Sequence, residues 1–98
     1  DNYPVTEGHH LIIPNRPTED FFSMTETERN DAMDLIRVLK NKIQDDESVV
    51  GFNIGINSGE SSGQTVMHSH IHLIPRRKGD IPNPRGGVRG VIPEKMDY

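Results

Sequence analysis

The sequence contains no cysteine and no tryptophan, and only 5% of its 98 residues are aromatic. Without cysteine, neither a disulfide nor a cysteine-ligated zinc site can form within this chain. Hydrophobic residues make up only 32% of the sequence. A chain of this length buries roughly 60–65% of its unfolded surface. We therefore expect a single domain with a thin core, which gains stability from a partner subunit or from further chain.

Long apolar runs are also absent. No run approaches the roughly 20 residues that a membrane span requires, so we expect no membrane contact. No targeting segment is visible, which makes the cytoplasm the expected location. The chain starts at Asp1 without a methionine, which is typical of a piece of a longer protein. The net charge of −4 argues against general nucleic-acid binding but leaves a small phosphorylated ligand open.

Residues 25–44 carry the clearest helix pattern. Thr25 and Glu28 have the spacing of a capping box, in which each side chain bonds to the other residue's backbone amide. The apolar residues that follow at helical spacing are Ala32, Leu35, Ile36, Leu39 and Ile43. The pattern predicts a helix over 25–44 that lies on a sheet.

Two apolar runs, His9–Pro14 and Val49–Asn57, predict strands. Phe21 and Phe22 should anchor the connector between the first strand and the helix. In the second strand we expect Phe52, Ile54 and Ile56 to share one face. The loop at 58–63 has no room for a crossover helix, so this strand and the next should be antiparallel neighbours.

The last part of the chain has a different composition. Residues 81–93 contain three prolines and three glycines, and we expect an extended tail.

Three of the five histidines stand at alternate positions within residues 64–76. Strand-forming residues surround His68, His70 and His72, and Pro75 closes the run. In a strand these histidines would line one face about 6.6 Å apart. The opposite face would carry the residues that pack, which are Ser69, Ile71 and Leu73.

Such a row of imidazoles could supply a nucleophile, a proton donor and a phosphate ligand. Gly59 and Gly63 bracket a loop whose free amides could cradle a phosphate, because glycine permits positive φ. Neutral donors stand nearby at Asn57, Ser61, Ser62, Gln64 and Thr65. These residues indicate phosphate chemistry at the mouth of the hairpin.

Other interpretations remain open. The strand could face solvent with no role for its histidines. A zinc site is another possibility, although positions on one strand lie in a line and a tetrahedral centre needs convergent ligands. Only His9 and His10 could add to such a site. A cupin-like site is not indicated, because no glutamate follows the His-x-His pair closely.

The segment His68–Ile74 resembles the signature of the histidine triad (HIT) family, His-φ-His-φ-His-φ-φ with φ apolar. Ser69 departs from the first apolar position, which should affect only packing behind the histidines. Three more segments match the family: Asp1–Pro4, Gly8–Pro14 and Gly63–Val66. The resemblance covers roughly residues 1–80. It implies an α+β fold, in which one long helix packs on an antiparallel sheet.

HIT proteins are nucleotide hydrolases and transferases that attack an α-phosphate. The resemblance implies that His70 forms a covalent nucleotidyl intermediate that water resolves. It implies that His72 contacts the phosphate and assists charge or proton movement. His68 would support these two from behind, and His9 would do likewise.

The same resemblance implies the binding residues. Asn57, Gln64 and Thr65 match positions that touch phosphate or the leaving group, and Gly63 belongs to the same turn. Asp1 matches an acid that binds the ribose hydroxyls.

Two details narrow the branch within the family. Transferases typically carry glutamine where this chain has His72, which favours a hydrolase. Residues 75–80 resemble the fragile-histidine-triad type of dinucleoside polyphosphate hydrolase. We expect a purine nucleotide or dinucleotide as ligand. A phosphoramidate hydrolase of the same family and a nucleotide-binding sensor with negligible turnover remain alternatives.

We expect no required cofactor beyond a divalent cation that the substrate could carry. No zinc is expected, because Pro17 stands near the place of an additional family histidine and the cysteines are absent. The family's N-terminal helix and hairpin do not appear, so we expect one HIT-like domain over residues 1–98 that lacks them. Family dimers form across the long helix, which implies a homodimer.

Overall fold

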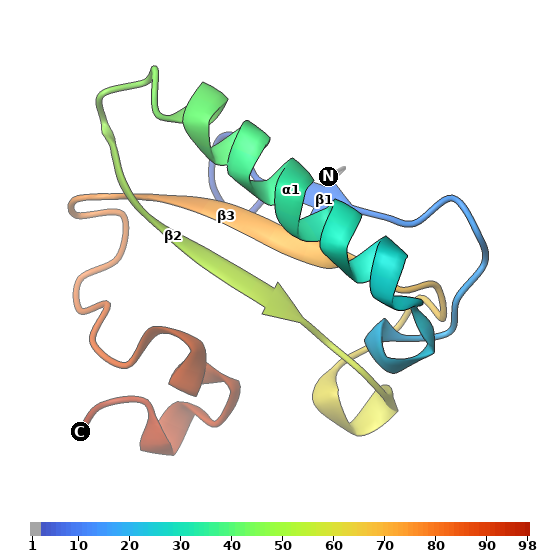
Figure 1. The fold of residues 1–98 in the computed structure, drawn as a ribbon. Helices are drawn as coiled ribbons and strands as arrows, with labels where there is room; N and C mark the ends of the chain where they lie inside the picture. Colours follow the sequence, from blue (N-terminus) through green and yellow to red (C-terminus); the bar gives the residue numbers. More distant parts are fainter. Residues whose placement is uncertain (1–2) are drawn as a thin grey trace.

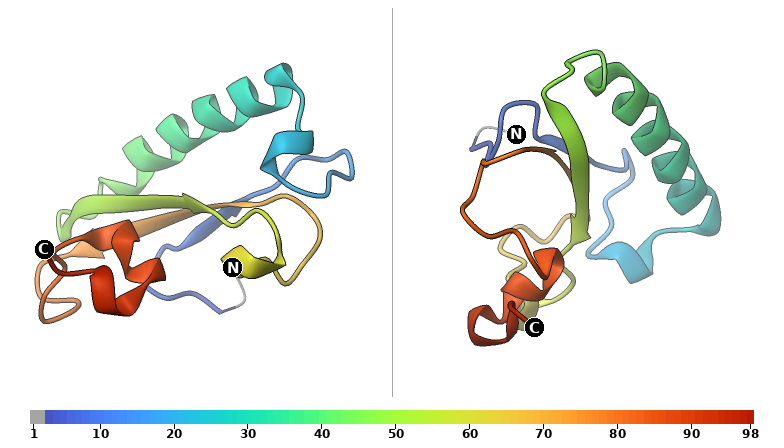
Figure 2. Two further views of the ribbon diagram at one scale, coloured as in Figure 1. Left: turned by 90° about the horizontal axis from the view of Figure 1, so that it is seen from below. Right: turned by 90° about the vertical axis from the view of Figure 1, so that its left-hand side faces the viewer.

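The computed structural model describes residues 3–98 and shows one three-stranded antiparallel sheet. Its strands are β1 (His10–Ile12), β2 (Val49–Ile56) and β3 (Ile71–Arg77), in the order β1-β3-β2. The helix α1 (Glu26–Ile43) covers one face of the sheet, and the C-terminal segment lies on the other side (Figure 1; Figure 2). The expected α+β architecture is confirmed.

The start of α1 is fixed by the capping box that the sequence predicted. The Thr25 hydroxyl accepts a hydrogen bond from the Glu28 amide at 3.1 Å. The Glu28 carboxylate accepts one from the Thr25 amide at 2.8 Å. These bonds satisfy two donors that the first helical turn would otherwise leave without partners. The helix ends one residue before Gln44, so its predicted extent is confirmed.

The buried face of α1 differs from the predicted stripe at one position. Ala32 and Ile36 are buried, whereas Leu35 is 44% exposed. Consecutive helical residues point about 100° apart, so Leu35 leaves the sheet when Ile36 faces it. The placement of Leu35 in the core was wrong.

The core lies between α1 and the sheet. Its buried cluster consists of Ile12, Met24, Ala32, Ile36, Ile71 and Leu73. Phe21 packs against this cluster, as expected, but Phe22 is 78% exposed and anchors nothing there. In β2, Phe52 and Ile56 also pack against the core, whereas Ile54 is 49% exposed. β2 lies at an edge of the sheet. Its apolar residues pair with the buried residues Pro75, Leu73 and Ile71, so they share one face as predicted, although Ile54 remains exposed there.

The strands themselves are close to their predicted positions. β1 is shorter than the predicted run, and β2 ends one residue before Asn57. β2 and β3 pair antiparallel, as the short loop between them required.

The tail is folded rather than extended. It forms two short 3₁₀-helices, η3 (Gly87–Val91) and η4 (Pro93–Lys95). Gly86 has a φ of +93°, and a Cβ at this position would lie 1.9 Å from the backbone oxygen of Met96. Only glycine fits such a turn, so the glycines let the chain fold back where an extended tail was expected.

Candidate active site

Burial alternates from residue 69 to residue 75, which agrees with the predicted separation of the histidines from the packing residues. The buried positions are Ser69, Ile71, Leu73 and Pro75. The half-buried positions between and before them include His68, His70 and His72. The Ser69 hydroxyl donates to the sulfur of Met24 at 3.1 Å, so this departure from the family signature is accommodated in the packing behind the histidines.

The regular strand, however, begins only at Ile71, so His68 and His70 precede it and only His72 belongs to β3. The prediction of one strand over residues 64–76 was therefore too long at its start. Ile12 of β1 and Ile56 of β2 both pair with Ile71, and both neighbouring strands end there. Residues before Ile71 have no strand on either side to continue the ladder.

The tautomers of His68 and His70 follow from their backbone partners. The Nε2 atom of His68 lies 3.1 Å from the carbonyl oxygen of Pro14. The Nδ1 atom of His70 lies 2.9 Å from the carbonyl oxygen of His68. A carbonyl only accepts, so each of these nitrogens carries the proton. Neutral His70 therefore keeps a lone pair on Nε2, which is the atom that can act as a nucleophile.

The tautomer of His72 is fixed through a second histidine. The amide of Val5 donates to Nδ1 of His9 at 3.1 Å, so the proton of neutral His9 lies on Nε2. That Nε2 is 2.9 Å from Nδ1 of His72 and donates to it. The proton of neutral His72 is therefore on its own Nε2, as a hydrogen-bond donor. The ring centroids of His70 and His72 are 5.1 Å apart, so the lone pair and the donor belong to neighbouring rings.

Burial keeps His9 and His72 neutral. Burial, with repulsion from His70 and His9 in second place, lowers the pKa of His72 from its ordinary value of 6.5. Burial also lowers the pKa of His9 from 6.5, and the neighbouring charge of His10 contributes. Both imidazoles are therefore mainly uncharged at pH 7, which the tautomer chain requires.

The loop between β2 and β3 has the predicted glycine conformations but not the predicted phosphate cradle. Gly59 and Gly63 have φ of +94° and +97°. Their amides are already bonded, to the side-chain oxygen of Gln64 and to the carbonyl of Glu60. The amides of Ser62 and Gln64 both donate to the carbonyl of Gly59. The short 3₁₀ turn closes the loop on itself, so these four amides are not free for a phosphate.

Gln64 belongs to the same set of hydrogen bonds that hold this loop in its closed shape. Its side chain is 2% exposed, and both amide hydrogens are used, toward the carbonyls of Glu19 at 2.6 Å and Val66 at 3.1 Å. A direct phosphate contact would have to break one of these bonds. Thr65 is exposed beside it, and Asn57 is half-buried and lines a cavity together with His9 and His72. Asp1, the expected ribose ligand, lies outside the described residues.

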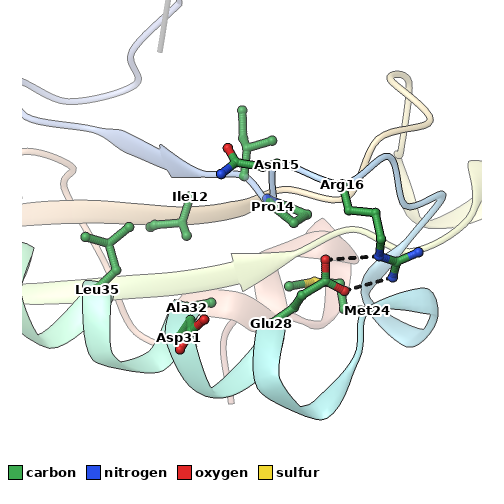
Figure 3. Close-up of a pocket in the computed structure, with 10 residues that line it drawn as sticks. Ile12, Pro14, Asn15, Arg16, Met24, Glu28, Asp31, Ala32 and Leu35 are labelled. Carbon is green, nitrogen blue, oxygen red and sulfur yellow. Dashed lines mark hydrogen bonds and ion pairs between the residues drawn. The ribbon is translucent and has the colours of Figure 1, made fainter.

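A different hollow, of about 380 Å³, lies between α1 and the end of β1. Figure 3 shows Arg16 and Glu28 paired at one side of it, with Ile12 on the strand side and Ala32 on the helix side. Glu28 serves both this pair and the helix cap, and the two roles lower its pKa to about 2. The hollow contains none of the histidines and is the groove where helix and strand meet.

Within residues 3–98, no three histidine or carboxylate side chains converge as a metal site would require. The sequence expectation that no zinc binds remains a prediction. Over the same residues, no helix combines the length and the apolar character needed to cross a bilayer.

The structure brings together His9, His68, His70, His72 and Asn57 as predicted site residues. It adds Asn53 and the tail residues of η3, which the sequence interpretation did not include. Asn53 stands two residues before Gly55 and four before Asn57, so the alternation of β2 would have placed it on the same face.

Comparisons with known proteins bear on the family of the chain. The family model described as "HIT domain" matches residues 1–79. The chain is 39% identical over 78 residues to the bis(5'-nucleosyl)-tetraphosphatase [asymmetrical] of Schizosaccharomyces pombe, covering 80% of this chain and 43% of that protein. It is 35% identical over 83 residues to the AP-4-A phosphorylase of Mycobacterium tuberculosis, covering 80% and 40%. The chain thus spans less than half the length of these two relatives.

A solved structure gives the same result for the fold. The crystal structure of a HIT family protein from Bacillus anthracis superposes with a TM-score of 0.72 at 39% sequence identity, covering 78% of this chain and 54% of that one. The match over 79 of 98 residues, together with the histidine geometry, shows that the chain belongs to the HIT domain family.

Proposed function

We propose that the chain is a nucleotide hydrolase that cleaves a phosphoanhydride at the α-phosphate through a nucleotidyl-His70 intermediate. The observation that carries the proposal is the pair of fixed tautomers, with a lone pair on His70 Nε2 and an N–H on His72 Nε2 in adjacent rings. The names of the two relatives support a dinucleoside polyphosphate as the substrate.

In the first step, His70 Nε2 attacks the α-phosphorus and forms a phosphorus–nitrogen bond. The bond to the bridging oxygen breaks, and its electrons leave with the departing phosphate. The ring of His70 then carries a positive charge, with Nδ1–H still bonded to the carbonyl of His68. This carbonyl dipole stabilises the charged ring, which is the supporting role expected for His68.

His72 serves as a neutral hydrogen-bond donor in this scheme. Its lowered pKa keeps it uncharged, so Nε2–H donates to a phosphate oxygen without transferring its proton. A departing phosphate is a stable anion and needs no proton at neutral pH. In the second step, water attacks the phosphorus, the electrons of the phosphorus–nitrogen bond return to His70, and a proton passes through a phosphate oxygen to bulk water.

The remaining predicted residues bind the substrate around this centre. Asn57 contacts the phosphate or the leaving group from the position just after β2, and Thr65 does so from the loop. Gly63 and Gln64 hold the loop in shape, with Gln64 contacting phosphate only if one of its internal bonds opens. Asp1 binds the ribose. No cofactor takes part, apart from a cation that arrives with the substrate.

We also propose that the chain acts as a homodimer. Three apolar side chains of α1, namely Met33, Leu35 and Val38, are 44–62% exposed, which supports a partner on the helix. Light scattering after gel filtration tests this directly. A monomer mass at micromolar concentration would contradict it.

A substrate panel tests the reaction. We expect hydrolysis of diadenosine tetraphosphate, with adenosine phosphoramidate as the alternative family substrate. Mass spectrometry after an alkaline quench should detect a nucleotidyl adduct on His70. His70→Ala should abolish turnover and the adduct while nucleotide binding persists, and His10→Ala is the matched control. Turnover near that of the parent chain in His70→Ala would sink the mechanism.

The same experiment separates the alternatives. A nucleotide-binding sensor would bind the panel without turnover or adduct. A phosphorylase would release the nucleotide only when inorganic phosphate is added, because phosphate rather than water would attack the adduct.

A further inference from the structure

A cavity of about 430 Å³ lies on the sheet face opposite α1, between β2, β3 and the turn of η3. Figure 2 shows the C-terminal segment beneath this face of the sheet, with the helix on the other side. His9 and His72 line the cavity, together with Asn57. Its volume falls within the roughly 300–1,000 Å³ of small-molecule sites.

The direction of the proposed reaction points the leaving group into this cavity. In phosphoryl transfer the attacking and departing atoms lie roughly in line, on opposite sides of the phosphorus. His70 supplies the attacking nitrogen and does not line the cavity, whereas its neighbour His72 does. A phosphate held between them would release its leaving group on the His72 side.

The walls of the cavity suit a flat, largely apolar group. Ile74 comes from β3, and Val88 and Val91 come from η3. Two of these side chains remain markedly exposed, at 62% for Val88 and 77% for Val91. A nucleobase has two apolar faces and would cover this surface, whereas phosphate alone would leave it in water.

A polar group inside the cavity has a fixed orientation. The side-chain oxygen of Asn53 accepts from Arg76 at 2.7 Å, and Arg76 is held in turn by two bonds to Asp80. The amide nitrogen of Asn53 therefore faces the other way, toward Gly87. It offers a donor to the acceptor atoms on the edge of a base. This gives a role to Arg76, which belongs to the segment that resembles the dinucleoside polyphosphate hydrolases.

The tail that forms one wall is tied into a fixed shape. The guanidinium groups of Arg85 and Arg89 lie 5.2 Å and 4.6 Å from the ring centre of Tyr98. Arg89 also donates to the carbonyl of Lys95 at 3.1 Å. The tail follows the segment 1–79 that matches the family model.

We propose that this cavity is the leaving-group subsite and takes the second nucleoside of a dinucleoside polyphosphate. The inference rests on the proposed function, because it assumes a phosphate between His70 and His72. It goes further by assigning the second base to Ile74, Val88 and Val91.

Equilibrium binding in a His70→Ala background tests the subsite. Diadenosine tetraphosphate and adenosine 5'-tetraphosphate share one nucleoside and the same phosphates, and only the first has a second nucleoside. The double variant Val88→Asn/Val91→Asn adds amides to exposed positions without adding charge. Its ratio of Kd for the dinucleotide to Kd for the mononucleotide should rise about tenfold. Ile92→Asn, at an exposed neighbour that does not line the cavity, should leave this ratio unchanged.

The possible results are distinct. An unchanged ratio in the double variant, with a native circular dichroism spectrum, overturns the subsite. Equal affinity of the His70→Ala chain for the two probes also overturns the subsite. The absence of binding of either probe to that chain overturns it as well. Turnover of adenosine phosphoramidate by the chain with His70 intact tests the proposed function separately, because this substrate has no second nucleoside.

Discussion

Replacing His9 with alanine removes the donor that fixes the tautomer of His72. The bond from His9 Nε2 to His72 Nδ1 is 2.9 Å long, and His9 is 6% exposed. Without it, the proton of His72 can move to Nδ1, and such a molecule presents no donor to the phosphate. We therefore expect His9→Ala to lower kcat more than it changes KM.

The size of the effect follows from the worth of one hydrogen bond. A partly buried hydrogen bond contributes about 0.5–1.5 kcal/mol net, which changes the ratio of the two tautomers roughly 2- to 13-fold. The loss of kcat should stay within that range. His70→Ala, by contrast, removes the attacking atom itself. The cavity left by His9 would also admit water to His72, which should bring the pKa of His72 back toward 6.5. Because a charged His72 carries N–H on both nitrogens, the loss of kcat should be seen at pH 8, where His72 is neutral.

Steady-state hydrolysis of diadenosine tetraphosphate at pH 8 measures this loss. His9→Gln, which retains an N–H donor, should recover part of kcat, and His10→Ala should behave as the parent chain. Two outcomes would refute the reasoning, provided that the fold is intact. One is a loss as complete as that of His70→Ala, and the other is an unchanged kcat.

Three further predictions concern stability. Because the folded-state pKa values of His9 and His72 lie below 6.5, the unfolded chain binds more protons, and the free energy of unfolding should fall as the pH drops below 6.5. Urea unfolding should show a smaller fall in His72→Phe. Thr25→Ala removes the helix cap and should cost about 1 kcal/mol in the same assay, with Thr25→Ser near the parent value. Gln64→Leu leaves the amide of Gly59 without its partner and should cost about 1–3 kcal/mol, and a negligible change would show that the loop does not depend on this brace.

The helix was predictable because its signals are local. Thr25 and Glu28 are three residues apart, and their reciprocal bonds need nothing from the rest of the chain. The apolar stripe located the buried face through Ala32 and Ile36. Leu35 was wrongly expected in the core, because helical periodicity shows which way an apolar stripe faces better than it shows how wide that stripe is.

The beginning of β3 was not predictable in the same way. The sequence supports extended structure well before Ile71, and Ser69 is buried as that pattern requires, but the chain bends at residues 66–68. Whether those residues form a strand depends on partners, and Ile12 and Ile56 end theirs opposite Ile71. The resemblance to the HIT family identified the histidines, but neither it nor the pattern could show that the amides of Gly59 and Gly63 are already bonded.

The three triad histidines are equal in the sequence and unequal in the structure, because each meets a different partner. His68 donates to the backbone carbonyl of Pro14, and His70 donates to the backbone carbonyl of His68. A side-chain substitution leaves a carbonyl in place, so these two tautomers are set by the course of the chain. The partner of His72 is a side chain, that of His9. Of the three tautomers, that of His72 is therefore the one that a single substitution outside the triad can reset without moving the backbone.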